Sequence, residues 1–82
     1  SNNKEIILTK NEIIIFNMLL SNKDRIVSKD ELMTELWNND EYINENALTV
    51  NISRLRSKLD EMGYPNIIET RKGIGYTIIW NI

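Results

Sequence analysis

Hydrophobic and polar positions in the second half of the chain follow the period of an α-helix. At about 100° per residue, one stripe of the segment 46–59 is wholly aliphatic. Its members are Leu48, Ile52, Leu55 and Leu59. We therefore predict a helix over 46–59 that packs on a core through this stripe and turns its other side to solvent. Gly63 follows as a typical helix stop.

Two further helices are predicted upstream, each opened by Thr or Ser with Glu three residues later, the spacing of a capping box. The first, from Lys10 to about Leu20, follows Thr9 and is apolar nearly all round, which indicates burial on more than one side. The second, over 29–37, follows Ser28. Its core face is expected to comprise Leu32, Met33, Leu36 and Trp37.

Short strands are predicted around these helices. They cover residues 4–8, 26–27, 67–70 and 76–80. The last two are joined by a basic, glycine-containing turn at 71–75, and Tyr76 and Trp80 are expected to pack in the core. An acidic loop at 38–45 precedes the third helix. The fold predicted for 1–82 is one α+β domain with three helices, a single short N-terminal strand and a C-terminal β-hairpin.

Composition excludes several classes of function. The 82 residues contain no Cys and no His, which removes thiolate and imidazole metal ligands and histidine general bases. Three acidic pairs, Asp30-Glu31, Asp40-Glu41 and Asp60-Glu61, lie at a predicted helix start, in a loop and at a helix end, so they do not indicate a metal or acid–base site. Gly73-Ile74-Gly75 suits a hairpin turn better than a nucleotide-binding loop. We expect no enzyme activity, metal or cofactor. Short apolar runs and the lack of a signal-peptide pattern predict a soluble, cytoplasmic protein without membrane contact.

The predicted solvent face of the 46–59 helix is cationic and free of carboxylates. Its side chains are Asn46, Thr49, Val50, Ser53, Arg54, Arg56 and Ser57. Two cations with short hydrogen-bonding groups and one valine methyl suit the major groove of DNA, although an ordinary solvated helix face would look similar. The following basic hairpin favours DNA. The formal net charge is −2, but residues 1–45 carry −4 and residues 46–82 carry +2.

From Leu8 to Ile78 the chain resembles the C-terminal winged helix-turn-helix DNA-binding domain of OmpR/PhoB-class response regulators. The resemblance is carried by five motifs in the same order as in that family. They are Leu8-Thr9-x-x-Glu12, Val27-Ser28-Lys29, Leu36-Trp37, the run from Val50 through Arg54-Leu55-Arg56 to Lys58-Leu59, and Thr70 with Lys72-Gly73-Ile74-Gly75-Tyr76. The sequence of the third helix and the hairpin is most similar to the branch of the family that responds to cell-envelope stress and antimicrobial peptides.

The resemblance implies that the third helix enters the major groove while the hairpin, or wing, reaches the adjacent minor groove. Arg54 would bind a base, with Val50 on a thymine methyl and Asn46 as a further base contact. The expected backbone contacts are Thr49, Asn51, Ser53, Arg56 and Ser57. Those expected in the minor groove are Arg71 and Lys72. A loop that touches RNA polymerase in such activators corresponds to Asn39, Asp40, Glu41 and Tyr42, where a plain solvated loop is the alternative.

The resemblance further implies a transcription regulator controlled by its own receiver domain and a sensor kinase. The chain is too short to hold that receiver domain as well. We expect a monomer in isolation and a dimer on promoter DNA, with two domains in tandem on a direct repeat. Four departures from the family pattern, at Asp24, Asn51, Ser53 and Thr77, change a turn or remove potential phosphate contacts. A winged helix that binds proteins without sequence-specific DNA binding is the alternative.

Overall fold

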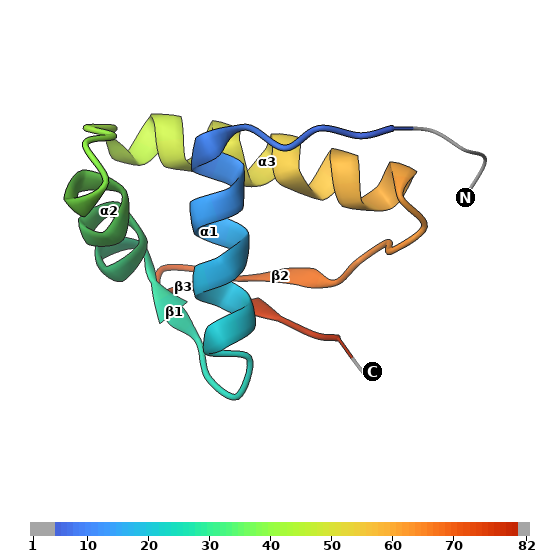
Figure 1. Ribbon diagram of the computed structural model, residues 1–82. Helices are drawn as coiled ribbons and strands as arrows, with labels where there is room; N and C mark the ends of the chain where they lie inside the picture. The colour runs from blue at the N-terminus through green and yellow to red at the C-terminus, as the bar shows by residue number, and fades with distance from the viewer. Residues whose placement is uncertain (1–4, 81–82) are drawn as a thin grey trace.

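The computed structural model describes residues 5–80, which form three helices and a three-stranded sheet (Figure 1). In chain order the elements are α1 (Lys10–Ser21), β1 (Val27–Ser28), α2 (Lys29–Asn38), α3 (Glu45–Glu61), β2 (Ile68–Arg71) and β3 (Gly75–Ile78). The predicted α+β fold is confirmed, and most predicted boundaries hold within one or two residues. No helix of this part of the chain is long and apolar enough to cross a membrane.

Both predicted capping boxes are present. The Thr9 hydroxyl accepts from the Glu12 amide at 3.2 Å, and the Glu12 carboxylate accepts from the Thr9 amide at 2.8 Å. Ser28 and Glu31 make the same reciprocal pair at the start of α2, at 3.1 and 2.8 Å. Each box satisfies amides that a helix start leaves without a partner, so these two starts are specified locally.

The end of α3 is also specified locally. Gly63 has φ +95°, its amide donates to Asp60 O at 3.1 Å, and the Tyr64 amide donates to Leu59 O at 2.9 Å. This is the hydrogen-bond pattern of a Schellman motif, which needs a left-handed residue where Gly63 stands. The predicted stop is confirmed, and the chain turns from the helix towards β2.

The sheet has the order β1–β3–β2 with both pairings antiparallel. Val27 lies opposite Tyr76, and Ile68 lies opposite Ile78. A three-residue turn at 72–74 joins β2 to β3, with Gly73 at φ +77°. This hairpin is the predicted wing, and β1 ties it to the start of α2.

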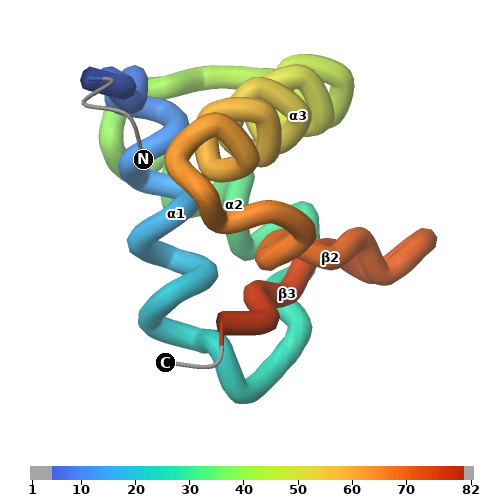
Figure 2. The backbone as a smooth tube through the Cα atoms, turned by 90° about the vertical axis from the view of Figure 1, so that its right-hand side faces the viewer, coloured from blue at the N-terminus to red at the C-terminus, as the bar shows by residue number. Residues whose placement is uncertain are grey.

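The core lies where the helices meet the sheet. Figure 1 shows α3 running across one side of the molecule, with α1 crossing in front of the strands. In the view of Figure 2 the β2–β3 hairpin projects beyond the helices, beside α3. The buried core residues come from every element and are Ile15, Leu19, Val27, Leu32, Leu36, Leu48, Ile52, Leu55, Leu59, Ile68, Tyr76 and Ile78.

Three predictions about the surroundings of the core were wrong or incomplete. Residues 5–8 form no strand, and residue 4 of that candidate lies outside the described residues. Trp37 is 51% exposed, and its indole nitrogen donates to Ile43 O of the α2–α3 loop at 3.1 Å. Ile13 on the apolar α1 is also exposed. Trp80, predicted in the core, is half-buried and packs against it, with its ring stacked on Phe16 at a centroid distance of 5.9 Å.

Candidate nucleic-acid interface

The helix α3 has the two faces that its sequence predicts. Its four aliphatic residues are buried in the core, whereas most of the predicted polar face is exposed. The exposed members are Asn46, Thr49, Val50, Ser53, Arg54 and Ser57. Asn51 and Arg56 are half-buried at its margins. Because these four aliphatic residues are fixed in the core, the direction of the opposite, carboxylate-free face is fixed as well.

The start of α3 differs from the prediction. Asn44 is the N-cap, with its side chain accepting from the Ala47 amide at 2.8 Å, so the helix begins at Glu45 rather than Asn46. This places one carboxylate in the first turn, where the helix dipole favours it. Lys29 of α2 pairs with Glu45 at 3.0 Å, and this hydrogen bond raises the pKa of Lys29. The pair joins the starts of α2 and α3.

The two arginines of α3 have different surroundings. Arg54 is exposed, and its guanidinium has no hydrogen-bond partner among the described residues. Arg56 donates from Nε to Ile68 O at 3.2 Å and from a terminal nitrogen to Thr70 Oγ1, both on β2. Sequence reasoning placed both arginines at DNA. The structure leaves Arg54 available to a ligand, and holds Arg56 against the wing.

Two of the predicted backbone contacts are turned towards their own helix. The Asn51 side chain donates to Ala47 O at 2.8 Å, and the Thr49 hydroxyl donates to Glu45 O at 3.2 Å. Side chains of this kind commonly bond to the carbonyl four residues earlier. The Asn51 amide keeps one N–H and its oxygen for further hydrogen bonds, whereas the Thr49 hydroxyl has used its single hydrogen and can only accept unless it reorients.

The wing carries the exposed cations of the hairpin. Lys72 lies in the exposed turn, and Arg71 at the end of β2 forms an ion pair with Glu69 on the same strand. Ile74, in the same turn, is 56% exposed and was not among the predicted contacts. Its carbonyl accepts from the Lys29 amide at 3.3 Å, so the turn is fixed to the start of α2.

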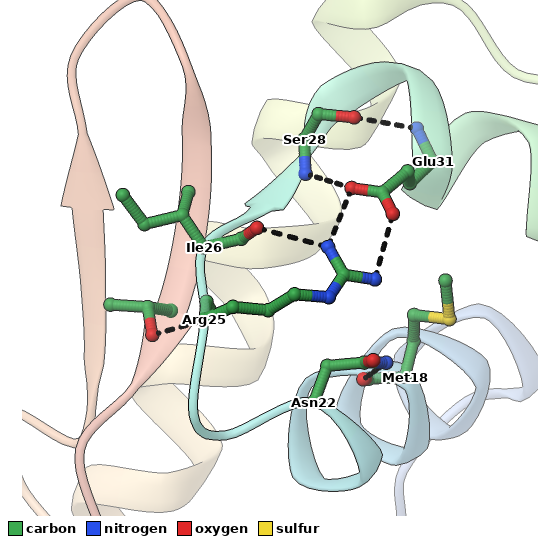
Figure 3. Close-up of polar contacts among 7 residues, drawn as sticks. Met18, Asn22, Arg25, Ile26, Ser28 and Glu31 are labelled. Atoms are coloured by element: carbon green, nitrogen blue, oxygen red, sulfur yellow. Dashed lines mark hydrogen bonds and ion pairs between the residues drawn. The ribbon is translucent and has the colours of Figure 1, made fainter.

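A polar cluster stabilises the turn between α1 and α2 (Figure 3). Arg25 donates to both oxygens of Glu31, at 3.0 and 2.8 Å, and to Ile26 O at 3.1 Å. The Arg25 hydrogen bonds, with the Ser28 amide, lower the pKa of Glu31 to about 2. Thr77, where the family often has a basic wing residue, is only 8% exposed, and its hydroxyl donates to Arg25 O at 3.1 Å. Its position therefore faces this turn rather than a ligand.

The loop between α2 and α3 is short and acidic. Asp40 has φ +64°, and its carboxylate accepts from the Tyr42 hydroxyl at 3.1 Å. Asp40 and Tyr42 are exposed, whereas Asn39 and Glu41 are half-buried. In the described part of the chain, no group of three or more His, Cys, Asp or Glu side chains could hold a metal ion.

These features define a winged helix-turn-helix domain whose third helix and wing present cations to solvent. Residues 3–78 match the family model described as "Transcriptional regulatory protein, C terminal". The chain belongs to this family, the OmpR/PhoB-type DNA-binding domains of two-component response regulators.

Curated relatives and solved structures agree with this assignment. The chain is 46% identical over 71 residues to the response regulator protein GraR of Staphylococcus aureus (strain MRSA252), covering 87% of the chain and 32% of GraR. It is 47% identical over 77 residues to the sensory transduction protein BceR of Bacillus subtilis (strain 168), covering 93% of the chain and 33% of BceR. The chain thus spans about a third of the length of these relatives.

Two solved structures are similar to the fold. The C-terminal domain of the nisin resistance regulator NsrR, a lantibiotic response regulator, superposes with a TM-score of 0.83 at 40% identity, covering 99% of this chain and 84% of that one. The DNA-binding domain of the response regulator AdeR, solved in complex with an intercistronic region, gives a TM-score of 0.77 at 29% identity, with 94% and 79% covered. The winged-helix assignment is therefore confirmed.

Proposed function

We propose that this domain binds double-stranded DNA sequence-specifically and controls transcription. The observation that carries the proposal is the exposed face of α3, which has no carboxylate from Asn46 to Ser57 and presents the unpaired guanidinium of Arg54. A helix of this kind beside a cationic wing suits adjacent major and minor grooves. The AdeR domain in complex with an intercistronic region supports the same use of the fold.

Within this proposal Arg54 has the main role in specificity. An exposed guanidinium on a helix held by its core face can donate two hydrogen bonds to O6 and N7 of one guanine. Val50, 45% exposed one turn earlier, is placed to contact a thymine methyl, and Asn46 to contact a further base. The proposed backbone contacts are Thr49, Asn51, Ser53, Arg56 and Ser57. Arg71 and Lys72 of the wing complete the surface in the minor groove.

The finer aspects of this role concern partners. We propose that two domains bind in tandem on a direct repeat, with half-sites about one helical turn apart. The isolated domain is proposed to be monomeric. Because the relatives are about three times as long, a receiver domain answering a sensor kinase is proposed for the full-length protein. We further propose that the loop Asn39–Tyr42 contacts RNA polymerase. The full-length protein is proposed to be cytoplasmic and to respond to lantibiotic-type peptides.

Selection from a random duplex library at near-physiological salt tests the proposal. Three proteins are compared: the wild type, Arg54→Ala, and Lys23→Ala as a control that removes an exposed cation from the turn after α1. The wild type and Lys23→Ala should enrich the same repeated half-site, and Arg54→Ala should lose or broaden it. If the wild type enriches nothing, even when fused to a dimeriser, the DNA-binding proposal is wrong and a protein-binding winged helix replaces it.

A further inference from the structure

Arg56 makes the hydrogen bonds between α3 and the wing. Among residues 5–80, Arg56 is the only one that forms a hydrogen bond between α3 and the β2–β3 hairpin. The other bonds that hold the hairpin run to β1, to Arg25 in the turn after α1, and to the Lys29 amide of α2. The hairpin is thus hydrogen-bonded to the rest of the fold mainly through β3 and the turn. Its near strand, β2, is hydrogen-bonded to α3 through Arg56, and Ile68 of that strand also packs in the core with the α3 residues.

The geometry at β2 suits a planar, forked donor. Ile67 O accepts from Ile79 N at 2.6 Å, so the next carbonyl, Ile68 O, points away from β3 towards the free edge of β2. Arg56 Nε donates to that carbonyl at 3.2 Å, while a terminal nitrogen donates to Thr70 Oγ1 two residues further on. The rigid guanidinium spans both acceptors, which the single ammonium of a lysine would not do in the same geometry.

Arg54 provides an internal comparison. Residues two apart on a helix do not share a face, so when Arg54 points outwards Arg56 points sideways, towards the sheet. Accordingly Arg54 is exposed, whereas Arg56 is half-buried with its guanidinium on β2. Neighbouring arginines with the same charge therefore stand in different environments.

We propose that Arg56 is a positioning residue, which sets the wing relative to α3 and acts on DNA binding through the wing cations. This inference rests on the proposed function and replaces one contact in it, because the direct backbone contact proposed above for Arg56 would contribute independently of the wing. In our account Arg56 fixes the separation between the part of the protein in the major groove and the part in the minor groove. The hydrogen bonds to Ile68 and Thr70 carry this effect.

A double-mutant cycle on the selected duplex separates the two roles. The variants are Arg56→Met, which keeps the aliphatic stem, the wing-tip variant Arg71→Ala/Lys72→Ala, and their combination. Affinity is measured by fluorescence anisotropy across a range of salt concentrations. For a positioning residue, Arg56→Met weakens binding about tenfold with the intact wing but by less than about twofold in the wing-tip variant, because coupled sites are not additive. In that background the salt slope stays unchanged.

The opposite result would be equal weakening in both backgrounds, with a slope lower by about one unit each time, as one lost phosphate contact produces. That result would overturn the positioning role. Arg56→Lys adds a second criterion, since it restores a charge but not the fork, and full recovery of affinity would also contradict the inference. Thr70→Val, which removes only the hydroxyl acceptor, should reproduce part of the Arg56→Met defect.

Folding and the broader proposal are controlled separately. Thermal unfolding of each variant confirms that it is folded at the assay temperature, and the milder Thr70→Val keeps the test valid if Arg56→Met is unstable. If the wild type shows no selective binding to any duplex, the proposed function and this inference are both overturned. Selective binding by the wild type with no effect of Arg56→Met would overturn this inference alone.

Discussion

Lys58 of α3 and Glu12 of α1 form an ion pair with Nζ and Oε1 2.6 Å apart, although they are 46 residues apart in sequence. Glu12 is only 1% exposed, and the same Lys58 ammonium donates to Ile7 O at 2.9 Å. Lys58 therefore holds the segment that enters α1 against the helix proposed to contact DNA. Glu12, which sequence reasoning treated only as a helix cap, is a buried link between the two helices.

Replacing Lys58 by Met should destabilise the fold. Loss of the ammonium leaves the buried Glu12 carboxylate without its cation, which we expect to lower the free energy of unfolding by about 2–3 kcal/mol. Chemical denaturation at neutral pH measures the change. Lys23→Met, at an exposed lysine of the turn after α1, is the matched control and should change it by less than about 0.5 kcal/mol. Equal effects of the two variants would disprove the pair's contribution.

Acid should destabilise the domain through two carboxylates. Burial acts to raise the pKa of Glu12, but hydrogen bonds from Lys58 and the Thr9 amide outweigh it, so this pKa lies below its ordinary value. Hydrogen bonds from Arg25 and from the Ser28 amide lower the pKa of Glu31 from 4.5 to about 2. A carboxylate with a lowered pKa in the fold stabilises it above the unfolded pKa, and this contribution is lost as pH falls towards the folded value.

Denaturation series between about pH 6 and about pH 3 test this pH dependence. The free energy of unfolding of the wild type should fall as the pH drops below about 4.5, the ordinary pKa of Glu. Glu31→Gln should be less stable than the wild type at neutral pH and should show a shallower decline on acidification. Parallel curves for the two proteins would show that Glu31 is not a source of the pH dependence.

Gly73 and Gly75 of the wing should respond differently to alanine. At Gly75 an added Cβ would overlap the Val27 carbonyl and lie 2.8 Å from Ser28 Cα, so Gly75→Ala should break the β1–β3 pairing. At Gly73, with φ +77°, the added atom meets open space, and the cost is the left-handed backbone strain of about 1–2 kcal/mol. We expect Gly75→Ala to lower the melting temperature much more than Gly73→Ala. The reverse order would contradict the close packing of β3 on β1.

Trp37 should affect the α2–α3 loop more than global stability. Trp37→Phe keeps an aromatic ring but removes the indole donor to Ile43 O, a neutral hydrogen bond on an exposed side chain worth about 1 kcal/mol. Hydrogen exchange should become faster for amides of residues 39–44 and stay nearly unchanged in α3, since loops open locally. Exchange that accelerates uniformly would show that Trp37 supports the core instead.

Local signals in the sequence accounted for most of the fold. The leucine stripe of α3, the capping boxes at Thr9 and Ser28, and the Gly63 stop depend on residues within a few positions of one another, so spacing alone specifies them. The exposed face of α3 follows from the same stripe. Helical periodicity thus predicted most of the exposed side chains of α3, and the family resemblance supplied the DNA contacts that are proposed for them.

The errors arose where tertiary contacts decide. Trp37 has the helical phase of a core residue, but its side chain is half-exposed and its indole donates to Ile43 O of the α2–α3 loop. Residues 5–8 have the composition of a strand, yet Ile7 O accepts from Lys58 and Leu8 packs against the core, and no strand among the described residues pairs with this segment. The hydrogen bonds of Arg56 depend on how closely β2 approaches α3, which sequence spacing does not specify.

The central claim, that Arg54 contacts a guanine, is tested most directly by 7-deazaguanine substitution in the selected duplex. Replacing N7 by carbon at one guanine at a time removes one acceptor of a bidentate contact. At one position per half-site the wild type should bind more weakly by about 1–3 kcal/mol, or roughly 5- to 150-fold, while Arg54→Ala should bind modified and unmodified duplexes equally. Sensitivity that persists in Arg54→Ala, or a wild type insensitive at every guanine, would contradict the account.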